Sequence, residues 1–207
     1  MRSVLIGFVL MLAVVSPVRA DFEKDLLVCE RQPSPQAGIA ACTRLLLTWQ
    51  TTDSKRAITY YNRGNAYRAL KKYRQAIANY DHSIRLNPLF VYAYINRGVT
   101  YRHLRQYQKA IANYKQAVRL DPKIALTYLN RANAYVGLNK YRKAIDDYDQ
   151  AIRLNPRYAK AYYYRGLIYQ DFYNNRRQAI ADYRAAYKLE PWRSKYAAKL
   201  RGMGVEP

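Results

Sequence analysis

Apolar and polar residues along most of this chain are spaced with the period of a helix. This helical pattern itself recurs at a longer, regular interval. In the stretch AITYYNRGNAYRAL, residues 57–70, apolar side chains recur three and four residues apart, which is the spacing of one helix face. The stretch YRQAIANYDHSIRLNP, residues 73–88, has the same spacing and closes with a proline, which lacks a backbone N–H and ends a helix. The two stretches recur together every 34 residues, in units that begin at residues 57, 91, 125 and 159. The pattern predicts four consecutive helical hairpins.

Small and aromatic residues occupy fixed positions in each unit, counted here from the first residue of that unit. Position 8 always holds a small residue: Gly64, Gly98, Ala132 and Gly166. Position 24 always holds tyrosine: Tyr80, Tyr114, Tyr148 and, after one inserted residue, Tyr183. Small residues let two helices approach closely, and aromatic rings fill the space around the contact. Repetition at a fixed period indicates a solenoid, because each unit is too small to bury its apolar face alone.

This pattern resembles the tetratricopeptide repeat, a helix-turn-helix unit of 34 residues. The resemblance covers residues 57–191, and the four units are 57–90, 91–124, 125–158 and, approximately, 159–193. It implies an all-α fold, a right-handed superhelical solenoid with a concave groove, and residues 192–207 are expected to form a C-terminal capping helix and tail. One departure is position 7, commonly apolar in the family, which is arginine in every unit: Arg63, Arg97, Arg131 and Arg165.

The resemblance also implies a non-catalytic adaptor that binds a protein or peptide in the groove, which the family lines with positions 2, 5, 6, 9 and 12. The candidate groove residues are Tyr61, Asn62, Asn65, Arg68, Tyr92, Asn96, Arg102, Asn130, Asn133, Lys160, Tyr163 and Tyr164. The repeated asparagines can bond an extended peptide backbone, or they recur only because the units were duplicated. A subset of the family clamps a C-terminal carboxylate with lysines at positions 5 and 2. Tyr61 and Leu126 stand there in this chain, which disfavours such a clamp.

The first twenty residues, MRSVLIGFVLMLAVVSPVRA, are typical of a secretory signal peptide. They have a basic start, an apolar run from Val4 to Val15 and a small-residue exit at Ala20, after which we expect cleavage. A retained membrane anchor is the alternative, although the run is shorter than the roughly 20 residues that span a bilayer. The signal predicts secretion across an inner membrane, into a bacterial periplasm.

Residues 21–56 are predicted to form a degenerate version of the same hairpin. Aligned on the repeats, Cys29 falls at position 11 and Cys42 at position 24, where the other units have tyrosines on facing helices. In an exported protein two cysteines favour a disulfide, which here would join the two helices. Two buried free thiols are the alternative.

Basic residues are concentrated in the repeats. The chain has a formal net charge of +22, and residues 55–201 contain 31 Lys and Arg against 8 Asp and Glu. The turns inside the hairpins suggest a basic stripe, defined by Lys71, Lys72, Arg74, Arg105, Lys109, Lys140, Arg142, Lys143, Arg176 and Arg177. Such a stripe can dock on an anionic envelope surface such as lipid head groups or a polyanionic polymer, or it is only solvated surface. Export argues against nucleic acid as the partner.

Residues that would support catalysis are sparse. The two histidines, His82 and His103, belong to no metal or triad pattern and are expected at the surface of helices. The acidic cluster Asp146, Asp147 and Asp149 is explained by ion pairs along its own helix with Lys143 and Arg153. We therefore expect no enzyme activity, no metal and no cofactor.

Overall fold

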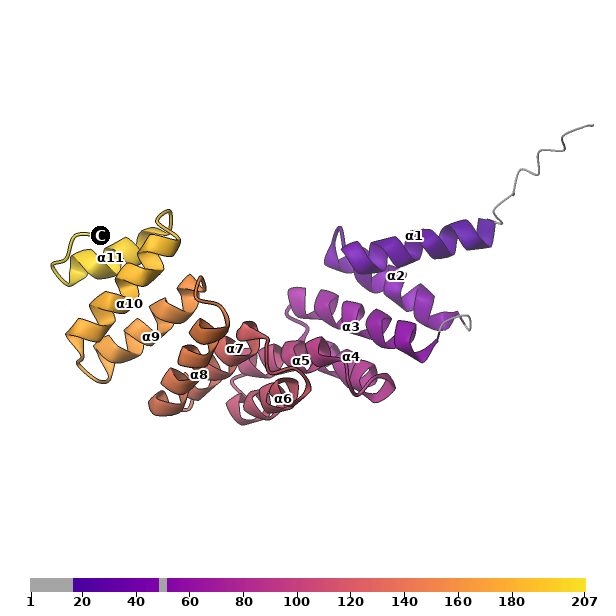
Figure 1. Ribbon diagram of the computed structural model, residues 1–207. Coiled ribbons are helices and arrows are strands. Elements are labelled where there is room, and N and C mark those ends of the chain that lie inside the picture. Colours follow the sequence, from indigo (N-terminus) through magenta and orange to yellow (C-terminus); the bar gives the residue numbers. More distant parts are fainter. Residues whose placement is uncertain (1–16, 49–51) are drawn as a thin grey trace, which may run out of the picture.

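The computed structural model describes residues 17–48 and 52–207, and helices are the only regular elements in these two stretches. Figure 1 shows them in chain order. The helices are α1 (Pro17–Arg31), α2 (Pro35–Leu47), α3 (Asp53–Ala69), α4 (Tyr73–Leu86), α5 (Val91–His103), α6 (Tyr107–Leu120), α7 (Ala125–Val136), α8 (Tyr141–Leu154), α9 (Ala159–Asp171), α10 (Arg176–Leu189) and α11 (Ser194–Gly202). The predicted all-α solenoid is confirmed.

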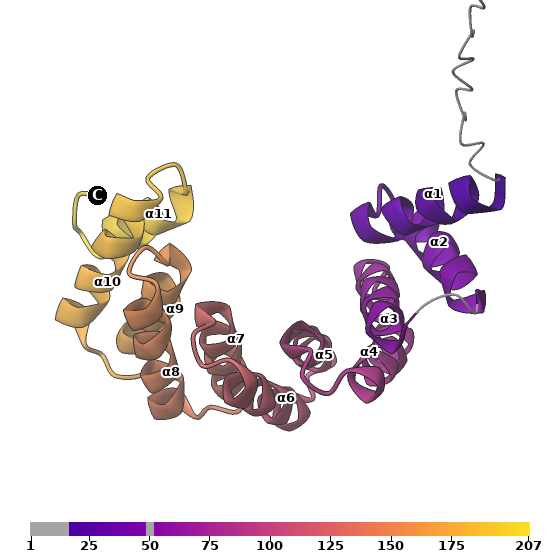
Figure 2. The same cartoon turned by 45° about the vertical axis from the view of Figure 1, so that its right-hand side comes forward.

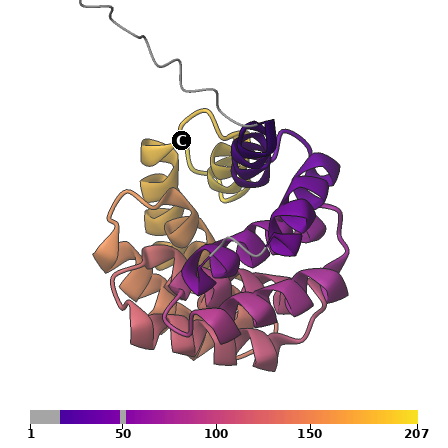
Figure 3. The ribbon, with the colours of Figure 1, turned by 90° about the vertical axis from the view of Figure 1, so that its right-hand side faces the viewer.

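Successive helices pair into hairpins that stack side by side along an open arc. The first helices of the four repeats, α3, α5, α7 and α9, lie on the inner side of the arc, and α4, α6, α8 and α10 lie outside (Figure 2). Seen from the side, the hairpins follow a winding path rather than a flat one (Figure 3). The inner helices therefore form the concave face on which the groove was predicted.

Each hairpin closes where the tyrosine of position 24 packs on the small residue of position 8. Tyr80 is fully buried, and a Cβ added to Gly64 would lie 2.7 Å from its ring, closer than any real contact allows. The same approach joins Gly98 to Tyr114, also at 2.7 Å. Glycine at this position lets the tyrosine ring lie directly against the backbone of the partner helix.

The turns inside the hairpins have one backbone conformation in common. A residue two or three positions beyond the end of each first helix has a left-handed φ: 58° at Lys71, 56° at Arg105, 56° at Asn139 and 47° at Asn174. The N–H of Lys72 then bonds the carbonyl of Tyr67 at 2.9 Å, which satisfies an orphan carbonyl at the helix end. In the fourth hairpin the equivalent bond runs from Asn175 to Tyr169, one residue further, so the insertion lies in this turn.

The two ends of the solenoid are closed differently. At the C-terminus α11 buries Tyr196 and Leu200 against the last hairpin, as a capping helix should, and Met203 directly after the helix is buried with them. At the N-terminus the hairpin α1–α2 packs on α3.

Residues 1–16 of the predicted signal peptide lie outside the described residues, while α1 continues through the predicted cleavage point after Ala20. Within the described stretches, every helix is too short or too polar to cross a membrane.

Candidate protein-binding groove

The inner face of the arc carries a row of exposed apolar side chains at position 2. Ile58 on α3 is 42% exposed, Tyr92 on α5 is 50% exposed and Leu126 on α7 is 43% exposed. Each holds position 2 of its unit, so the three side chains occupy equivalent places on neighbouring inner helices. We call these three residues the apolar row. The fourth repeat departs from it, because its position 2 is Lys160.

A pocket of about 220 Å³ continues the apolar row at its N-terminal end. Its apolar walls come from three helices: Phe22 and Leu26 of α1, Leu45 of α2 and Ile58 of α3. The pocket can hold one large apolar side chain. Sequence reasoning missed it because only the docking of the degenerate hairpin on α3 brings these residues together.

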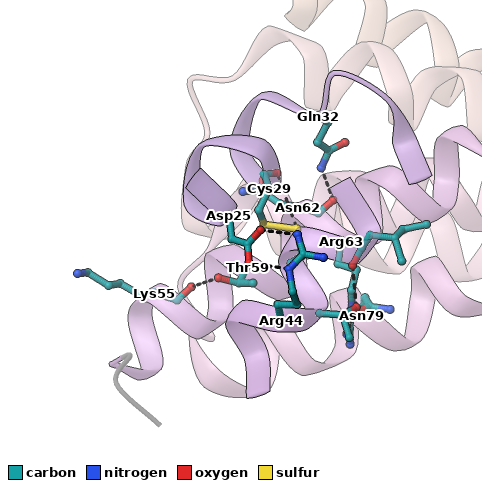
Figure 4. Close-up of a disulfide and its surroundings, with 12 residues drawn as sticks. Asp25, Cys29, Gln32, Arg44, Lys55, Thr59, Asn62, Arg63 and Asn79 are labelled. Carbon is teal, nitrogen blue, oxygen red and sulfur yellow. Dashed lines mark hydrogen bonds and ion pairs between the residues drawn. A yellow bond between two sulfur atoms is a disulfide. The ribbon is translucent and has the colours of Figure 1, made fainter. Parts of the chain in front are cut away.

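A disulfide between Cys29 and Cys42 lies beside this pocket and joins α1 to α2, as the sequence suggested (Figure 4). The two Cα atoms are 4.9 Å apart, and both cysteines are buried. An ion pair between Asp25 and Arg44 links the same two helices, with Arg44 Nε donating to Asp25 Oδ2 at 2.7 Å. The amide of Gln32 donates to the carbonyl of Asn62 at 2.5 Å, which fastens the hairpin to α3.

Three of the asparagines on the inner helices, Asn65, Asn96 and Asn133, are engaged by the fold itself. Asn65 accepts from the hydroxyl of Tyr80 and from the amide of Asn96, both at 2.8 Å. Asn133 accepts from the hydroxyl of Tyr148 at 2.6 Å. Asn96 also donates to Tyr61 Oη at 3.0 Å. Asn65 and Asn133, at position 9, thus have a structural reason to be asparagine, because they satisfy buried tyrosine hydroxyls, and Asn96, at position 6, links adjacent repeats.

Aromatic side chains gather at the C-terminal end of the inner face. The ammonium of Lys195, from α11, lies 4.4 Å from the ring centre of Tyr163 and 5.8 Å from that of Tyr164. Burial lowers the pKa of Lys195, and the nearby Arg193 and Lys160 add to the effect. The predicted groove residues of the fourth repeat are therefore covered in part by the capping helix, through a cation–π contact.

The arginines of position 7 form hydrogen bonds and ion pairs between helices, which the sequence did not reveal. In the second repeat Arg97 donates to Asn113 Oδ1 at 2.7 Å, at position 23 of its own unit, and to Asp81 Oδ1 at 2.5 Å, at position 25 of the preceding unit. The equivalent contacts join Arg63 to Asn79 and Thr43, Arg131 to Asp147, and Arg165 to Asp182 and Asp149. We call Arg63, Arg97, Arg131 and Arg165 the paired row.

The explanation given to the acidic cluster of α8 was wrong. Asp147 bonds Arg131 of α7 at 2.6 and 2.8 Å, and Asp149 bonds Arg165 of α9, so both ion pairs run between helices rather than along α8. Arg153 instead donates to Gln150. Across the two described stretches, no group of three acidic, histidine or cysteine side chains is placed to hold a metal.

The two histidines lie at the surface and stack on tyrosines. His82 stacks on Tyr60 with ring centres 4.7 Å apart, and His103 stacks on Tyr73 at 5.4 Å. Burial lowers the pKa of each imidazole, and neighbouring arginines lower it further. They are helix-surface residues in contact with aromatic rings.

All ten residues of the basic stripe are exposed. Among the described residues none of the ten pairs with a carboxylate, although Arg176 donates to the carbonyl of Met203 and so also holds the C-terminal tail. A second pocket, of about 250 Å³, lies between the outer helices at this edge. Three lysines contribute to its lining: Lys115, Lys140 and Lys143.

Comparison with known protein families assigns these hairpins to one family. The family model for the tetratricopeptide repeat matches residues 57–90, 91–124 and 125–158, which are the first three units. The chain belongs to the tetratricopeptide-repeat family. The fourth unit of this tetratricopeptide-repeat protein lies outside the match, but its helices α9 and α10 form the same kind of hairpin. No curated protein sequence matches the chain significantly.

Solved structures resemble the tetratricopeptide-repeat protein over most of its length. MamA 41-end from Desulfovibrio magneticus RS-1 has a TM-score of 0.73 at 20% identity, and the match covers 83% of this chain and 94% of that one. YrrB, described as a tetratricopeptide-repeat protein with an unusual peptide-binding site, has a TM-score of 0.67 at 19% identity, covering 85% and 88%. At these identities the likeness shows the fold.

A shorter match is more similar in sequence. The first tetratricopeptide domain of Spaghetti (RPAP3), solved with the HSP90 peptide SRMEEVD, is 28% identical with a TM-score of 0.56. The match covers 57% of this chain and 94% of that one.

Proposed function

We propose that this protein is a non-catalytic adaptor that binds an extended peptide or protein segment along its concave face. The observation that carries the proposal is the apolar row, together with the pocket beside Ile58 into which it leads. Exposed apolar side chains aligned on one face are typical of an interaction surface, because burying them against a partner is favourable. Two structurally similar tetratricopeptide-repeat proteins are described as binding peptides, which supports the same role here.

The arrangement of the groove suggests how a segment would bind. The pocket beside the disulfide takes one large apolar side chain, and Tyr92 and Leu126 offer contact surface further along the arc. Because Asn65, Asn96 and Asn133 are already bonded inside the protein, most of the affinity comes from side chains rather than from an asparagine ladder. The partner should therefore be recognised by the spacing of its apolar residues.

Site-specific photo-crosslinking in the producing cell tests this proposal. A crosslinking amino acid at position 92 or 126 should yield one discrete adduct, whereas the same group at Arg85, exposed on the outer helix α4 and outside both pockets, should yield none. The adduct should disappear when Ile58 is changed to Ser, which opens the pocket but leaves the core intact. Adducts formed from Arg85 and from the inner positions alike would refute a groove-specific interaction.

Export is a further part of the proposal. The signal-like residues 1–20 support it, and so does a disulfide in the N-terminal hairpin, since disulfides persist mainly in oxidising compartments. N-terminal sequencing of the protein recovered from the periplasm should begin at Asp21. A sequence that begins at Met1 would instead indicate a retained anchor.

Docking on an anionic envelope surface is the second candidate function. It is favoured by the exposure of all ten stripe residues and by the lysine-lined pocket at that edge. Such binding should weaken steeply with salt, because charges are screened beyond about 8 Å at physiological ionic strength. Changing Lys140, Arg142 and Lys143 together to Gln should reduce retention on anionic liposomes without moving the thermal midpoint. Retention unchanged at low salt would show that the stripe is only solvated surface.

A further inference from the structure

We propose that the pocket between α6 and α8 binds the phosphate of a phosphomonoester lipid head group. This inference rests on the second candidate function, docking on an anionic envelope surface, and specifies the group that is recognised there. The pocket has a volume of about 250 Å³, and most of its walls come from these two helices, which lie on the outer side of the arc (Figure 2). It is therefore separate from the concave groove.

Three lysines from two helices border the pocket. Lys115 lies on α6, Lys140 is the N-cap residue of α8, and Lys143 belongs to the first turn of α8. Among the described residues none of these lysines is in an ion pair, and those that line the pocket include no Asp or Glu. An anion that enters the pocket therefore meets three ammonium groups and no competing carboxylate.

The equivalent junctions between the other units have a different charge. Position 25, which is Lys115 in the second unit, is Asp81 in the first unit and Asp149 in the third. Each of these two aspartates forms an ion pair with the arginine of the paired row in the following unit. Lys115 cannot bond Arg131 in the same way, so its ammonium is left for a ligand. The exchange of Asp for Lys makes this junction more positive by two charges than its neighbours are at the same position.

The start of α8 adds to the positive potential of the pocket. Lys140 and Lys143 place the first turn of this helix at the pocket, and Lys140 makes no capping hydrogen bond to that turn through its side chain. The N–H groups of a first turn have no acceptor inside the helix, and the helix dipole gives this end a partial positive charge. Helix ends with this property favour phosphate when other positive groups surround them.

The charge of the site matches a phosphomonoester better than an anion of single charge. Three ammonium groups and a helix N-terminus exceed the one negative charge that a carboxylate or a phosphodiester carries. A phosphomonoester carries about −1.5 to −2 charges at pH 7 and has three strong acceptor oxygens. Lysine ammonium groups donate charge-assisted hydrogen bonds to such oxygens.

Two features favour a membrane lipid as the carrier of the phosphate. Ile111, Ala112 and Leu138 give the pocket an apolar wall, against which the carbon atoms of a lipid head group can pack. Lys109 and Arg142 of the basic stripe are exposed on the same two outer helices. A surface with many anionic groups can therefore contact the stripe while one phosphate occupies the pocket, whereas a small soluble phosphate would contact the pocket alone.

Binding to vesicles of two compositions tests the site. Phosphatidylcholine vesicles are made anionic either with phosphatidic acid, a phosphomonoester, or with phosphatidylglycerol, a phosphodiester, and the two sets are matched in zeta potential. The wild-type protein should bind the phosphatidic acid vesicles about fivefold more tightly, the factor that corresponds to roughly one further charge near a membrane surface. The variant Lys115→Gln/Lys143→Gln should lose this preference.

Two further variants separate the pocket from the stripe and from stability. Arg74→Gln/Lys109→Gln removes two exposed charges of the basic stripe outside the pocket lining, so it should weaken binding to both vesicle types alike and keep the preference. Lys115→Asp should lose the preference without loss of the folded state, because the new carboxylate can pair with Arg131. Thermal unfolding of each variant checks that the protein is folded.

Four results would overturn the proposal. Equal binding of the wild-type protein to both vesicle types, with both double variants weakened alike, would refute the pocket and leave docking through the stripe intact. Absence of binding to either vesicle type at low salt would refute the docking function as well. A preference that survives in Lys115→Gln/Lys143→Gln would place recognition elsewhere. Competition by glycerol 3-phosphate as strong, per phosphate, as that by phosphatidic acid vesicles would assign the pocket to a soluble phosphomonoester instead of a lipid.

Discussion

Two rows of arginine run along the same inner helices and have opposite surroundings. The paired row, at position 7, lies between helices and bonds acceptors from its own unit and, in three of four cases, from the preceding unit. Arg68 and Arg102, at position 12, form no ion pair among the described residues, and the Nε atom of each is buried without an acceptor. The comparison shows that the role of an arginine at a given repeat position depends on which helices adjoin it, and not on its charge alone.

The two rows also differ in what their removal would leave behind. Arg165 is 15% exposed and bonds Asp182, which is 3% exposed, so removing the arginine leaves a buried carboxylate without a partner. Burial raises the pKa of the Asp182 carboxyl, and the bonds from Arg165 lower it. Removing Arg102 leaves no such carboxylate. Stability should therefore depend more on the paired row than on Arg68 and Arg102.

The largest expected effect comes from breaking the paired row at its C-terminal end. Arg165→Met should lower the free energy of unfolding by about 3–5 kcal/mol, the usual cost of leaving one half of a buried ion pair. Arg102→Met is the matched control and should cost less, about 1 kcal/mol, because it breaks no ion pair. Urea unfolding of both variants measures the difference. Equal losses would contradict the distinction between the rows.

The inter-repeat contact made by Arg63 is the weakest of the paired row. It reaches the N-terminal hairpin, whose two helices are joined by the disulfide. Arg63 meets the neutral hydroxyl of Thr43 at 3.0 Å, where Arg97 meets Asp81. Replacing both cysteines by Ala should remove about 3 kcal/mol from the N-terminal hairpin, in the chain-entropy account of a loop of this length. Hydrogen exchange should then accelerate in α1 and α2 and stay unchanged in α7 and α8. Faster exchange along the whole solenoid would show that the hairpin is not a local unit.

A smaller effect separates the tyrosines of position 24. Tyr80→Phe should cost about 1 kcal/mol, because it leaves Asn65 with one hydrogen bond fewer. Tyr114→Phe removes a hydroxyl that has no partner, so it should be neutral or slightly stabilising. Thermal unfolding of the two variants side by side makes the comparison. A loss in Tyr114→Phe as large as that in Tyr80→Phe would mean that Arg102 already satisfies the hydroxyl.

The smallest expected effect comes from a substitution that would complete the paired row. Arg131 bonds Asp147 of its own unit but lacks a contact to the preceding one, where position 25 is Lys115 instead of the aspartate found at 81 and 149. Lys115→Asp should supply that contact and stabilise the protein by about 0.5 kcal/mol, since the new pair is partly exposed. Lys115→Ala is the control for loss of the lysine alone. An equal gain in both variants would indicate relief of charge repulsion rather than a new ion pair.

Several features could be predicted because they depend on residues close together in sequence. The spacing of apolar residues and the closing prolines predicted the hairpins, and the packing of Tyr80 on Gly64 follows from symmetric positions around one turn. The aligned positions of Cys29 and Cys42 suggested their pairing for the same reason. The partners of Arg63, Arg97 and Arg165 were not foreseen, because part of each set lies in a different unit.

By itself the sequence determined the secondary structure, the period, the repeat family and the excess of positive charge, all of which are local or additive properties. Only the tertiary structure decided which charges are neutralised. Arg97 and Arg102 are five residues apart on α5, yet one meets carboxylate and amide oxygens on two outer helices and the other forms no ion pair among the described residues. Hydrogen bonds and ion pairs act only at contact distance. Which oxygens reach each arginine therefore depends on how helices that are distant in the chain pack together.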